Sequence, residues 1–429
     1  MVLKTRWTLQ AGLQGLGLGL GLLLFGAPAP AATITIACGS NGQDHASCKR
    51  HTDDWARKTG HTVKLYVTPS STTDLLGVFR KMFAAASPEI DVVMVDVVWP
   101  GLIKEHLVDL KKYSKGAEYF HFQAIVRNNT QEGKLLAMPW FTDAGLLFYR
   151  KDLIAKYGLR PPKTWDELAL VAQKIQKGER TAGAADFQGF VFQAKAYEGL
   201  SCDALEWLNA FDGGSVVDAK GAITVNNPHA VKALQTAASW VGTIAPAQVL
   251  NYGEEDARGV FQSGKAAFMR NWPYAWSMGN SADSPIKGKI GVSPLPSAVA
   301  GGPRGATLGG WQLAVSKYSK NVDAAADLVM YLTSAAVQKE RSIQGSYNPT
   351  LRSLYSDREV LQANPFLDEL YKVFQAASPR PSTVTGLKYP EVSESFWNAT
   401  HEVLSGKATA QDSLRRLEAR LQQIKRGAW

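Results

Sequence analysis

The sequence DVVMVD at residues 91–96 decides the class of fold. Its continuous apolar run is typical of a parallel strand that is buried on both faces of a sheet. The segments before it alternate between strand-like and helical patterns, at residues 33–37, 44–58, 63–67 and 72–86. This alternation predicts an α/β fold in which helices flank a sheet.

A second unit with the same alternation begins after residue 145. Residues 146–149 read as a strand, and a capping box from Thr164 to Glu167 opens a helix through Gln176. The last helix has an apolar stripe that consists of Leu414, Leu417, Leu421 and Ile424. Two such units agree with the length of 429 residues, which corresponds to roughly two or three domains.

The first residues have the pattern of a signal peptide. Lys4 and Arg6 precede the uncharged apolar run Leu9–Phe25, and a tract of alanine and proline follows. We therefore predict export to the periplasm, with cleavage near Ala31 or Ala32. An uncleaved membrane anchor is the alternative, because the apolar run is nearly long enough to span a bilayer.

The charge of the chain argues against a nucleic-acid partner. The formal net charge is +9, and it falls to +7 once the two positive residues of the leader are removed. The Lys and Arg residues are spread along the sequence, so no segment resembles a nucleic-acid footprint. A weak bias towards anionic membrane surfaces remains open.

The cysteines predict one disulfide. An exported chain reaches an oxidising compartment, where Cys38 and Cys48 would close a short loop with a stabilisation of about 2–3 kcal/mol. His45 and His51 lie close by, which raises a metal site as the alternative, but the spacing matches no standard zinc pattern. We therefore predict no metal, and we expect Cys202 to be a buried free thiol.

The segment RNWPYAW at residues 270–276 places three large aromatic residues within five positions. Flat rings with polar edges suit sugars, because stacking covers the apolar face of a pyranose while carboxylates, amides or Arg bond its hydroxyls. A core turn packed with aromatic rings is the alternative. Asp96 and Asp143 follow strand-like runs, and ligands of open α/β sheets bind beyond the carboxyl ends of strands. We expect both carboxylates to contact the ligand.

Short segments spread over nearly the whole mature chain match a known family: 96–99, 143–153, 197–200, 202–203, 270–276, 306–311 and 379–381. Together they resemble the trehalose/maltose-binding proteins of bacterial and archaeal ABC importers, within the family-1 extracellular solute-binding proteins. The chain is also similar to the α-glucoside binders of Gram-negative bacteria, whose N-terminus carries a comparable cysteine pair.

The resemblance implies a periplasmic-binding-protein fold of type II, with two α/β lobes, each a sheet flanked by helices, and a hinge between the lobes. After a signal peptide at 1–32, lobe I would comprise 33–142 plus 304–346. Lobe II would comprise 143–303 plus 347–429. The sugar would lie in the cleft between the lobes.

The resemblance also implies roles for single residues. It implies that hydrogen bonds from the sugar hydroxyls are accepted by Asp96, Asp143 and Glu254, and that the sugar rings stack on Trp272 and Tyr274. It further implies that the cleft is lined by Gly310 and Trp311, and that a donor to the sugar is supplied by Arg380. Gln43 lies in the first strand–helix loop, where some relatives carry an acidic contact, so an amide there departs from the pattern. Phe141 stands where some relatives have Tyr.

The function that follows is that of a periplasmic receptor of an ABC sugar importer. We expect the chain to bind an α-linked disaccharide, such as trehalose or maltose, without a cofactor or metal. As a monomer it would deliver the sugar to inner-membrane permease subunits, and it would not be an enzyme. A secreted glycoside hydrolase acting on α-glucosides is the alternative, because such an enzyme also needs carboxylates and aromatics. A sensor subunit that feeds a signalling partner is a third possibility, which the sequence does not separate from transport.

Overall fold

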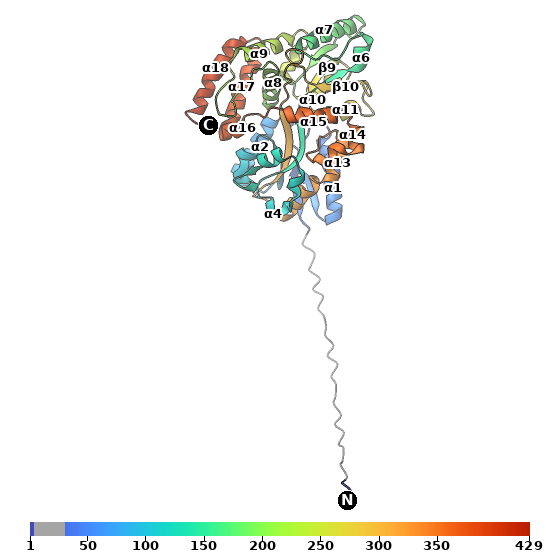
Figure 1. The fold of residues 1–429 in the computed structure, drawn as a ribbon, viewed down its shortest axis with the longest axis vertical. Coiled ribbons are helices and arrows are strands. Elements are labelled where there is room, and N and C mark those ends of the chain that lie inside the picture. Colours follow the sequence, from blue (N-terminus) through green and yellow to red (C-terminus); the bar gives the residue numbers. More distant parts are fainter. Residues whose placement is uncertain (4–30) are drawn as a thin grey trace. The chain divides into compact units, whose positions relative to one another are not determined.

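The computed structural model describes residues 1–3 and 31–429. The predicted signal peptide, residues 1–32, therefore lies almost entirely outside the described residues. Residues 32–429 form one unit, which Figure 1 colours along the chain. Within the described ranges, none of the helices is long and apolar enough to cross a membrane.

The elements of this unit follow the chain in this order. The strands are β1 Thr33–Ala37, β2 Thr62–Leu65, β3 Val92–Asp96, β4 Thr130–Gln131, β5 Lys134–Leu135, β6 Met138–Ala144, β7 Leu146–Arg150, β8 Gln188–Val191, β9 Ala266–Asn271, β10 Ile290–Pro294 and β11 Leu308–Val315. The α-helices are α1 Asp44–Thr59, α2 Thr72–Ala84, α3 Pro100–Ile103, α4 Lys111–Ser114, α5 Gln123–Asn129, α6 Lys151–Lys156, α7 Trp165–Thr181, α8 Glu198–Ala210, α9 Pro228–Trp240, α10 Glu254–Gln262, α11 Ala275–Gly279, α12 Val322–Leu332, α13 Ala335–Gly345, α14 Arg358–Ala363, α15 Leu367–Ala376, α16 Ser382–Thr385, α17 Tyr389–Leu404 and α18 Ala410–Lys425. The 3-10 helices are η1 Lys104–His106, η2 Ala117–Phe120, η3 Ala247–Asn251, η4 Arg352–Ser356 and η5 Gly386–Lys388.

The first sheet contains the apolar run of residues 91–96. Its strand order is β2-β1-β3-β11-β6, with β1 parallel to β2 and β3, and β11 antiparallel to β3 and β6. Every residue of β3 is buried, which confirms the prediction of a strand covered on both faces. The carboxyl ends of β1 and β3 point the same way, so the loops that follow them lie at one edge of the sheet.

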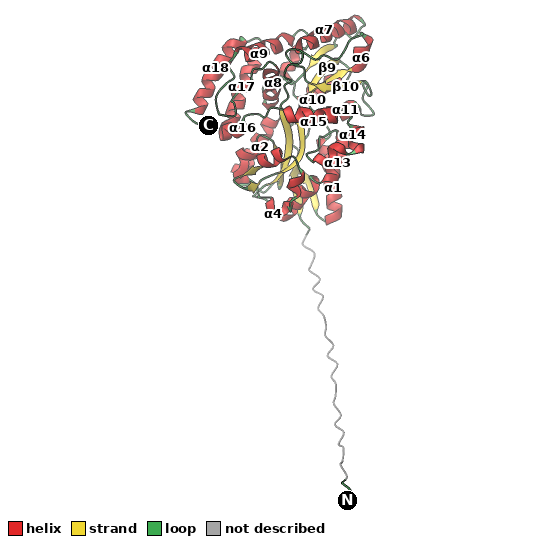
Figure 2. Cartoon of the chain, in the orientation of Figure 1, coloured by secondary structure: helices red, strands yellow, loops and turns green. Residues whose placement is uncertain are grey.

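The second sheet has the strand order β10-β7-β9-β8, and its strands are drawn in yellow in Figure 2. Successive side chains of a strand point to opposite faces. Leu147 therefore belongs to one hydrophobic core, and its neighbours Leu146 and Phe148 belong to another. The core around Leu147 also holds the predicted C-terminal stripe of α18, from Leu414 to Ile424.

Helix α7 begins as its sequence predicts. The Thr164 side chain accepts a bond from the Glu167 backbone N–H over 3.2 Å, and the Glu167 carboxylate accepts one from the Thr164 N–H over 3.3 Å. This reciprocal capping box satisfies N–H groups that the first turn would otherwise leave unpaired. Trp165, the next residue, is 1% exposed and packs with its ring centroid 5.0 Å from that of Trp240.

The chain passes from the first sheet to the second between β6 and β7, through Gly145. A Cβ at Gly145 would lie 2.0 Å from Oε1 of Glu206, so only glycine allows this close approach. The chain returns after β10, where Thr307 forms a bridge with Ser378. Together these crossings place the end of the first sheet against the second. The lobe boundaries given above remain a prediction.

Candidate functional site

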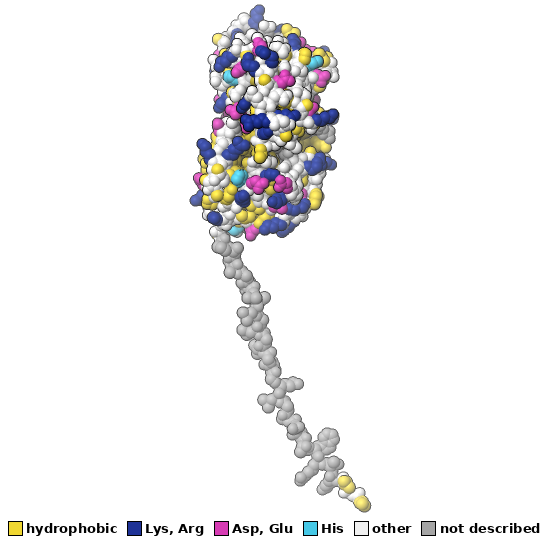
Figure 3. All heavy atoms as spheres, turned by 90° about the vertical axis from the view of Figure 1, so that its left-hand side faces the viewer, with side chains coloured by type: hydrophobic (Ala, Val, Ile, Leu, Met, Phe, Trp, Pro, Cys, Tyr) yellow, Lys and Arg dark blue, Asp and Glu magenta, His cyan; other side chains and the backbone are white. Residues whose placement is uncertain are grey.

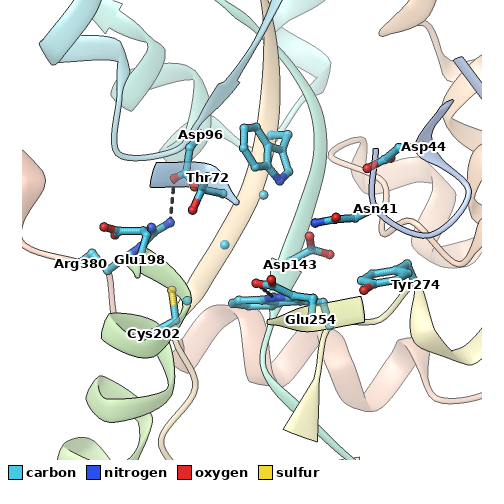
Figure 4. Close-up of a pocket in the computed structure, with 15 residues that line it drawn as sticks. Asn41, Asp44, Thr72, Asp96, Asp143, Glu198, Cys202, Glu254, Tyr274 and Arg380 are labelled. Atoms are coloured by element: carbon cyan, nitrogen blue, oxygen red, sulfur yellow. Dashed lines mark hydrogen bonds and ion pairs between the residues drawn. The ribbon is translucent and has the colours of Figure 1, made fainter. Parts of the chain in front are cut away.

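A cavity lies between the strand ends of the first sheet and the elements of the second (Figure 4). It encloses about 580 Å³ of space without protein atoms, which includes space open to solvent. The residues that line it are Asn41, Asp44, Thr72, Asp96, Asp143, Glu198, Gly199, Cys202, Glu254, Trp272, Tyr274, Gly309, Gly310, Trp311 and Arg380. In Figure 4, Asp143 lies between Asn41 and Glu254, near the middle of this set.

Strand β11 brings Asp96 and Asp143 to the same cavity. It pairs with β3 on one side and with β6 on the other, and the register places Trp311 opposite Asp96. The adjoining Gly310 has a φ of 123°. A Cβ at this position would lie 2.6 Å from the carbonyl oxygen of Phe141. The cavity wall therefore requires glycine at this point.

Asp96 and Glu198 share one guanidinium group. Arg380 donates from Nη2 to Asp96 Oδ1 and from Nη1 to Glu198 Oε1, each over 2.7 Å. Glu198 also accepts bonds from the hydroxyls of Tyr389 and Ser393. Burial alone would lower the pKa of Arg380. The negative charges around it, of which Asp96 has the largest effect, raise the pKa above its ordinary value. The residue predicted to donate to the sugar is thus paired with carboxylates from β3 and α8.

Asp143 carries the unpaired carboxylate of the cavity. Its side chain is 8% exposed, and no donor within the described residues bonds it. Burial raises the pKa of Asp143 to about 8, and the charge of Asp44 acts in the same direction against Arg270 and Arg341. A buried carboxylate without partners is unfavourable, so the side chain is largely protonated at neutral pH, and hydroxyl donors from a ligand would favour its ionised form.

Asp44, rather than Gln43, reaches the cavity from the loop after β1. Gln43 is the N-cap of α1, and its side chain forms no capping bond. Burial raises the pKa of Asp44 to about 6 against the charge of Arg341, whose Nη2 lies 3.4 Å from Asp44 Oδ1. The guanidinium carbon of Arg341 in turn lies 3.9 Å from the centre of the Trp140 ring.

The ring of Trp272 packs against a guanidinium group. The guanidinium carbon of Arg270 lies 4.0 Å from the centre of the Trp272 ring. Arg270 is held by Asp203, with an Nε to Oδ1 distance of 3.0 Å, and by Glu206. Trp272 Nε1 donates to Glu254 Oε1 over 3.4 Å. These contacts fix the plane of an indole ring at the cavity wall.

Tyr274 connects the two sheets. It follows β9 of the second sheet, but its ring packs in the hydrophobic core of the first. Its hydroxyl donates to Glu255 Oε1 over 2.6 Å, and Arg258 holds the same carboxylate. The neighbouring Glu254 accepts a bond of 2.6 Å from the Tyr197 hydroxyl. Two acidic residues of the first turn of α10 are therefore oriented by tyrosine hydroxyls.

The structure brings together every residue predicted to contact the ligand except Gln43. The sequence reasoning missed other lining residues, namely Asn41, Asp44, Thr72, Gly199, Cys202 and Gly309. Asp44 stands next to Gln43 in the sequence. Cys202 was expected to be a buried free thiol, and it is, but its place in the cavity was not foreseen. Contact of these side chains with a ligand remains a prediction.

A disulfide joins Cys38 and Cys48. It ties the end of β1 to α1, and the loop between them carries the lining residues Asn41 and Asp44. Burial raises the pKa of the remaining thiol, Cys202. Over residues 1–3 and 31–429, no group of three or more His, Cys, Asp or Glu residues is arranged to hold a metal ion.

Comparisons with known proteins agree on one family. The model for bacterial extracellular solute-binding proteins matches residues 40–339. A probable ABC transporter-binding protein of Deinococcus radiodurans is 56% identical over 396 residues, which cover 92% of this chain and 94% of that protein. The solved structure of maltose-bound T. maritima MalE3 is 40% identical, with a TM-score of 0.87, and the match covers 92% of this chain and 100% of that one.

A more distant structure shares the fold. The GacH receptor of Streptomyces glaucescens has a TM-score of 0.81 at 24% identity, and the match covers 93% of this chain and 100% of that one. The α/β architecture with two helix-flanked sheets is thus the periplasmic-binding-protein fold, as predicted. The family model spans well over half of the sequence, and the Deinococcus relative spans nearly all of it. The chain belongs to the bacterial extracellular solute-binding proteins.

Proposed function

We propose that this protein binds an α-linked disaccharide of the maltose or trehalose type in the cavity. It then delivers the sugar to the inner-membrane permease of an ABC importer. The protein acts in the periplasm as a monomer after removal of its leader, without a cofactor or metal.

The unpaired carboxylate of Asp143 is the observation that carries the proposal. It lies in a cavity whose wall also contains the rings of Trp272, Tyr274 and Trp311. A sugar fits this combination, because its hydroxyls donate to the carboxylate while its C–H faces stack on the rings. Asp44 supplies a second acceptor from the start of α1, in the loop region after β1.

Groups from both sheets line the cavity, which supports binding coupled to closure. Asp96 comes from β3 of the first sheet, whereas Glu254 and Trp272 adjoin β9 of the second. A ligand that contacts both sides favours the closed arrangement through its differential affinity for that state. We assign the moving parts to the two lobes whose boundaries are predicted above.

The relatives support the same class of ligand and partner. The T. maritima protein was solved with maltose, and the Deinococcus protein bears the name of an ABC transporter component. The alternative of a glycoside hydrolase has no support from either relative. Asp96, one of the two carboxylates that such an enzyme would use, is already bonded to Arg380.

Isothermal titration with maltose, trehalose and sucrose, beside the β-linked cellobiose, tests the proposal. We expect saturable heat from at least one α-linked sugar and a much weaker response to cellobiose. Absence of heat with every α-linked sugar, for protein shown to be folded, would refute it. Release of free glucose in proportion to protein would instead favour the hydrolase.

A further inference from the structure

The first sheet has a second end, opposite the cavity. Strands β1 and β3 run parallel and finish near the cavity, so their first residues, Thr33 and Val92, lie at the other end. Strand β11 runs the opposite way, and its last residue, Val315, pairs with Val92. The segments that follow Val315 and precede Thr33 therefore meet at this end.

A short basic and aromatic segment covers this end. It comprises α4, which is linked to the start of the sheet through the beginning of α12, and η2, whose Tyr119 hydroxyl accepts a bond from Lys111 Nζ of α4. The Tyr113 hydroxyl donates to Asp323 Oδ1 over 2.6 Å, and Asn321 Nδ2 donates to the Thr33 carbonyl oxygen over 3.2 Å. In η2, Tyr119 is 66% exposed and Phe120 is 73% exposed. Figure 1 places α4 at the lower end of the folded unit.

Lysines are paired with tyrosine rings across this end. The Nζ atoms lie 4.5 Å from the ring centre for Lys112 and Tyr113, 4.6 Å for Lys111 and Tyr119, 4.8 Å for Lys58 and Tyr331, and 5.4 Å for Lys317 and Tyr318. Each contact holds an ammonium group beside an aromatic surface. We call this surface the basic aromatic end, and it consists of Lys58, Lys111, Lys112, Tyr113, Lys115, Tyr119, Phe120, Lys317, Tyr318, Lys320 and Tyr331.

Several acidic groups nearby are engaged, whereas Glu89 and Glu105 are exposed. Glu118 is buried and pairs with Lys111, and Asp323 accepts the Tyr113 hydroxyl bond. Asp109 accepts bonds from the backbone N–H groups of Lys111 and Leu135, each over 3.0 Å. The exposed lysines apart from Lys111 are Lys58, Lys112, Lys115, Lys317 and Lys320, and they outnumber the exposed Glu89 and Glu105. Figure 3 shows Lys and Arg side chains beside hydrophobic ones at the lower end of the face it displays.

We propose that the basic aromatic end binds the surface of an anionic phospholipid bilayer. The lysines would pair with lipid phosphates, and the rings of Tyr119 and Phe120 would enter the headgroup region, where amphipathic and aromatic side chains are favoured. The fit is one of charge complementarity, because each lysine held near an anionic surface adds to the attraction. The cavity, at the opposite ends of the same strands, stays free of the bilayer.

The path of the chain supports a bilayer as the partner. The polypeptide enters the folded unit at this end, where Ala32 N–H donates to His61 Nδ1 over 3.0 Å. The apolar leader run ends at Phe25, so at most seven residues, or about 25 Å of extended chain, separate it from Thr33.

Flotation with lipid vesicles tests the inference on exported protein from which the leader has been removed. We expect binding to vesicles of equal phosphatidylglycerol and phosphatidylcholine, weakening as salt rises, and little binding to phosphatidylcholine alone. The triple substitution of Lys111, Lys112 and Lys115 by Gln should lower the partition coefficient on the order of 100-fold, at roughly fivefold per lysine. Substitution of Tyr119 and Phe120 by Ser should weaken binding without changing the charge.

A matched control removes the same charge elsewhere. Lys163, Lys174 and Lys177 are exposed in and before α7, and their triple substitution by Gln should leave vesicle binding within about threefold of the parent. Thermal unfolding checks that each variant is folded. Equal losses in both triple variants, or binding to soluble dextran sulfate that matches binding to vesicles, would overturn the proposal in favour of unspecific anion attraction. Equal binding to neutral and anionic vesicles would overturn it as well.

Discussion

The two ends of the first sheet carry opposite charges in opposite environments. At the cavity end, Asp44, Asp96 and Asp143 are buried. At the other end, lysines such as Lys112 and Lys115 are exposed. The same strands connect the two ends, so position along the strand decides whether a charge meets a ligand or the solvent.

The two ends differ in the free-energy cost of their charges. Buried carboxylates are unfavourable unless a cation or hydroxyl donors compensate them, and the raised pKa of Asp143, about 8, reflects that cost. Exposed lysines cost little, because water solvates them and salt screens them. Substitutions at the cavity end should therefore change stability and sugar binding, whereas substitutions of Lys112 and Lys115, which are exposed at the basic aromatic end, should change neither.

The largest expected effect comes from Arg380, which compensates Asp96 and Glu198. Arg380→Met should lower the free energy of unfolding by about 3–5 kcal/mol, because it leaves both carboxylates buried without their cation. Urea denaturation measures this loss. The control is Arg420→Met on the exposed face of α18, which should stay within about 0.5 kcal/mol of the parent. Equal effects of the two variants would mean that the cavity end is as well solvated as the surface.

The next effect concerns binding rather than folding. Trp272→Ala should weaken binding of the preferred α-linked disaccharide by about 3 kcal/mol, or on the order of 100-fold, because a ring fixed by Arg270 at the cavity wall loses its stacking surface. Titration calorimetry measures the change. Trp165→Phe is the matched control, since Trp165 is buried in the core away from the cavity lining. Unchanged affinity in Trp272→Ala would remove this ring from the proposed site.

Loss of the disulfide should have a smaller effect, on both the stability of the protein and its binding of sugar. Cys48→Ser opens the short loop and should lower the free energy of unfolding by about 2–3 kcal/mol. Because the loop carries Asn41 and Asp44, sugar binding should weaken as well. Cys202→Ser, which breaks no disulfide, separates the loss of a thiol from the loss of the cross-link. A Cys48→Ser protein with unchanged stability would show that the loop is held by other contacts.

Local patterns predicted the elements that local forces control. The apolar run of β3, the capping box at Thr164 and the stripe of α18 depend on neighbours within a few residues. The position of β11 depends on partners far away, since Gln312 pairs with Val95 in the ladder. Residue pairing over such distances leaves no periodic signal, so the antiparallel insertion of β11 was not foreseen. The helices α12 to α16 likewise received no prediction.

The cavity shows the same limit. Asp96 and Asp143 were predicted because strand ends can be located from sequence. The pairing of Arg380 with Glu198 could not be predicted from sequence, because 182 positions separate the two residues. Gln43 was proposed from the resemblance and not from a local pattern. The structure starts α1 at Asp44, as the sequence predicted, and the carboxylate of Asp44 lines the cavity.

A pH-dependent effect sharpens the comparison most directly, because it measures desolvation at Asp143. Asp143→Asn keeps the shape of the side chain but cannot ionise. The pKa of Asp143 is raised from its ordinary value of 3.8 to about 8 by burial. Between these pH values the folded parent protein binds one proton more than the unfolded chain, so its stability falls as pH rises, by at most about 1.4 kcal/mol per pH unit.

The stability of Asp143→Asn relative to the parent should therefore increase from about pH 4 to about pH 8 and stay constant above that. Urea denaturation at a series of pH values measures this difference, and the contributions of titrating groups that do not interact with Asp143 cancel in it. Asp166→Asn, on the exposed side of α7, controls for the loss of a surface carboxylate. A difference that does not vary with pH would mean that Asp143 ionises equally in both states. The cavity end would then hold its carboxylates in water, as the basic aromatic end holds its lysines, and the contrast between the two ends would reduce to the sign of the charge.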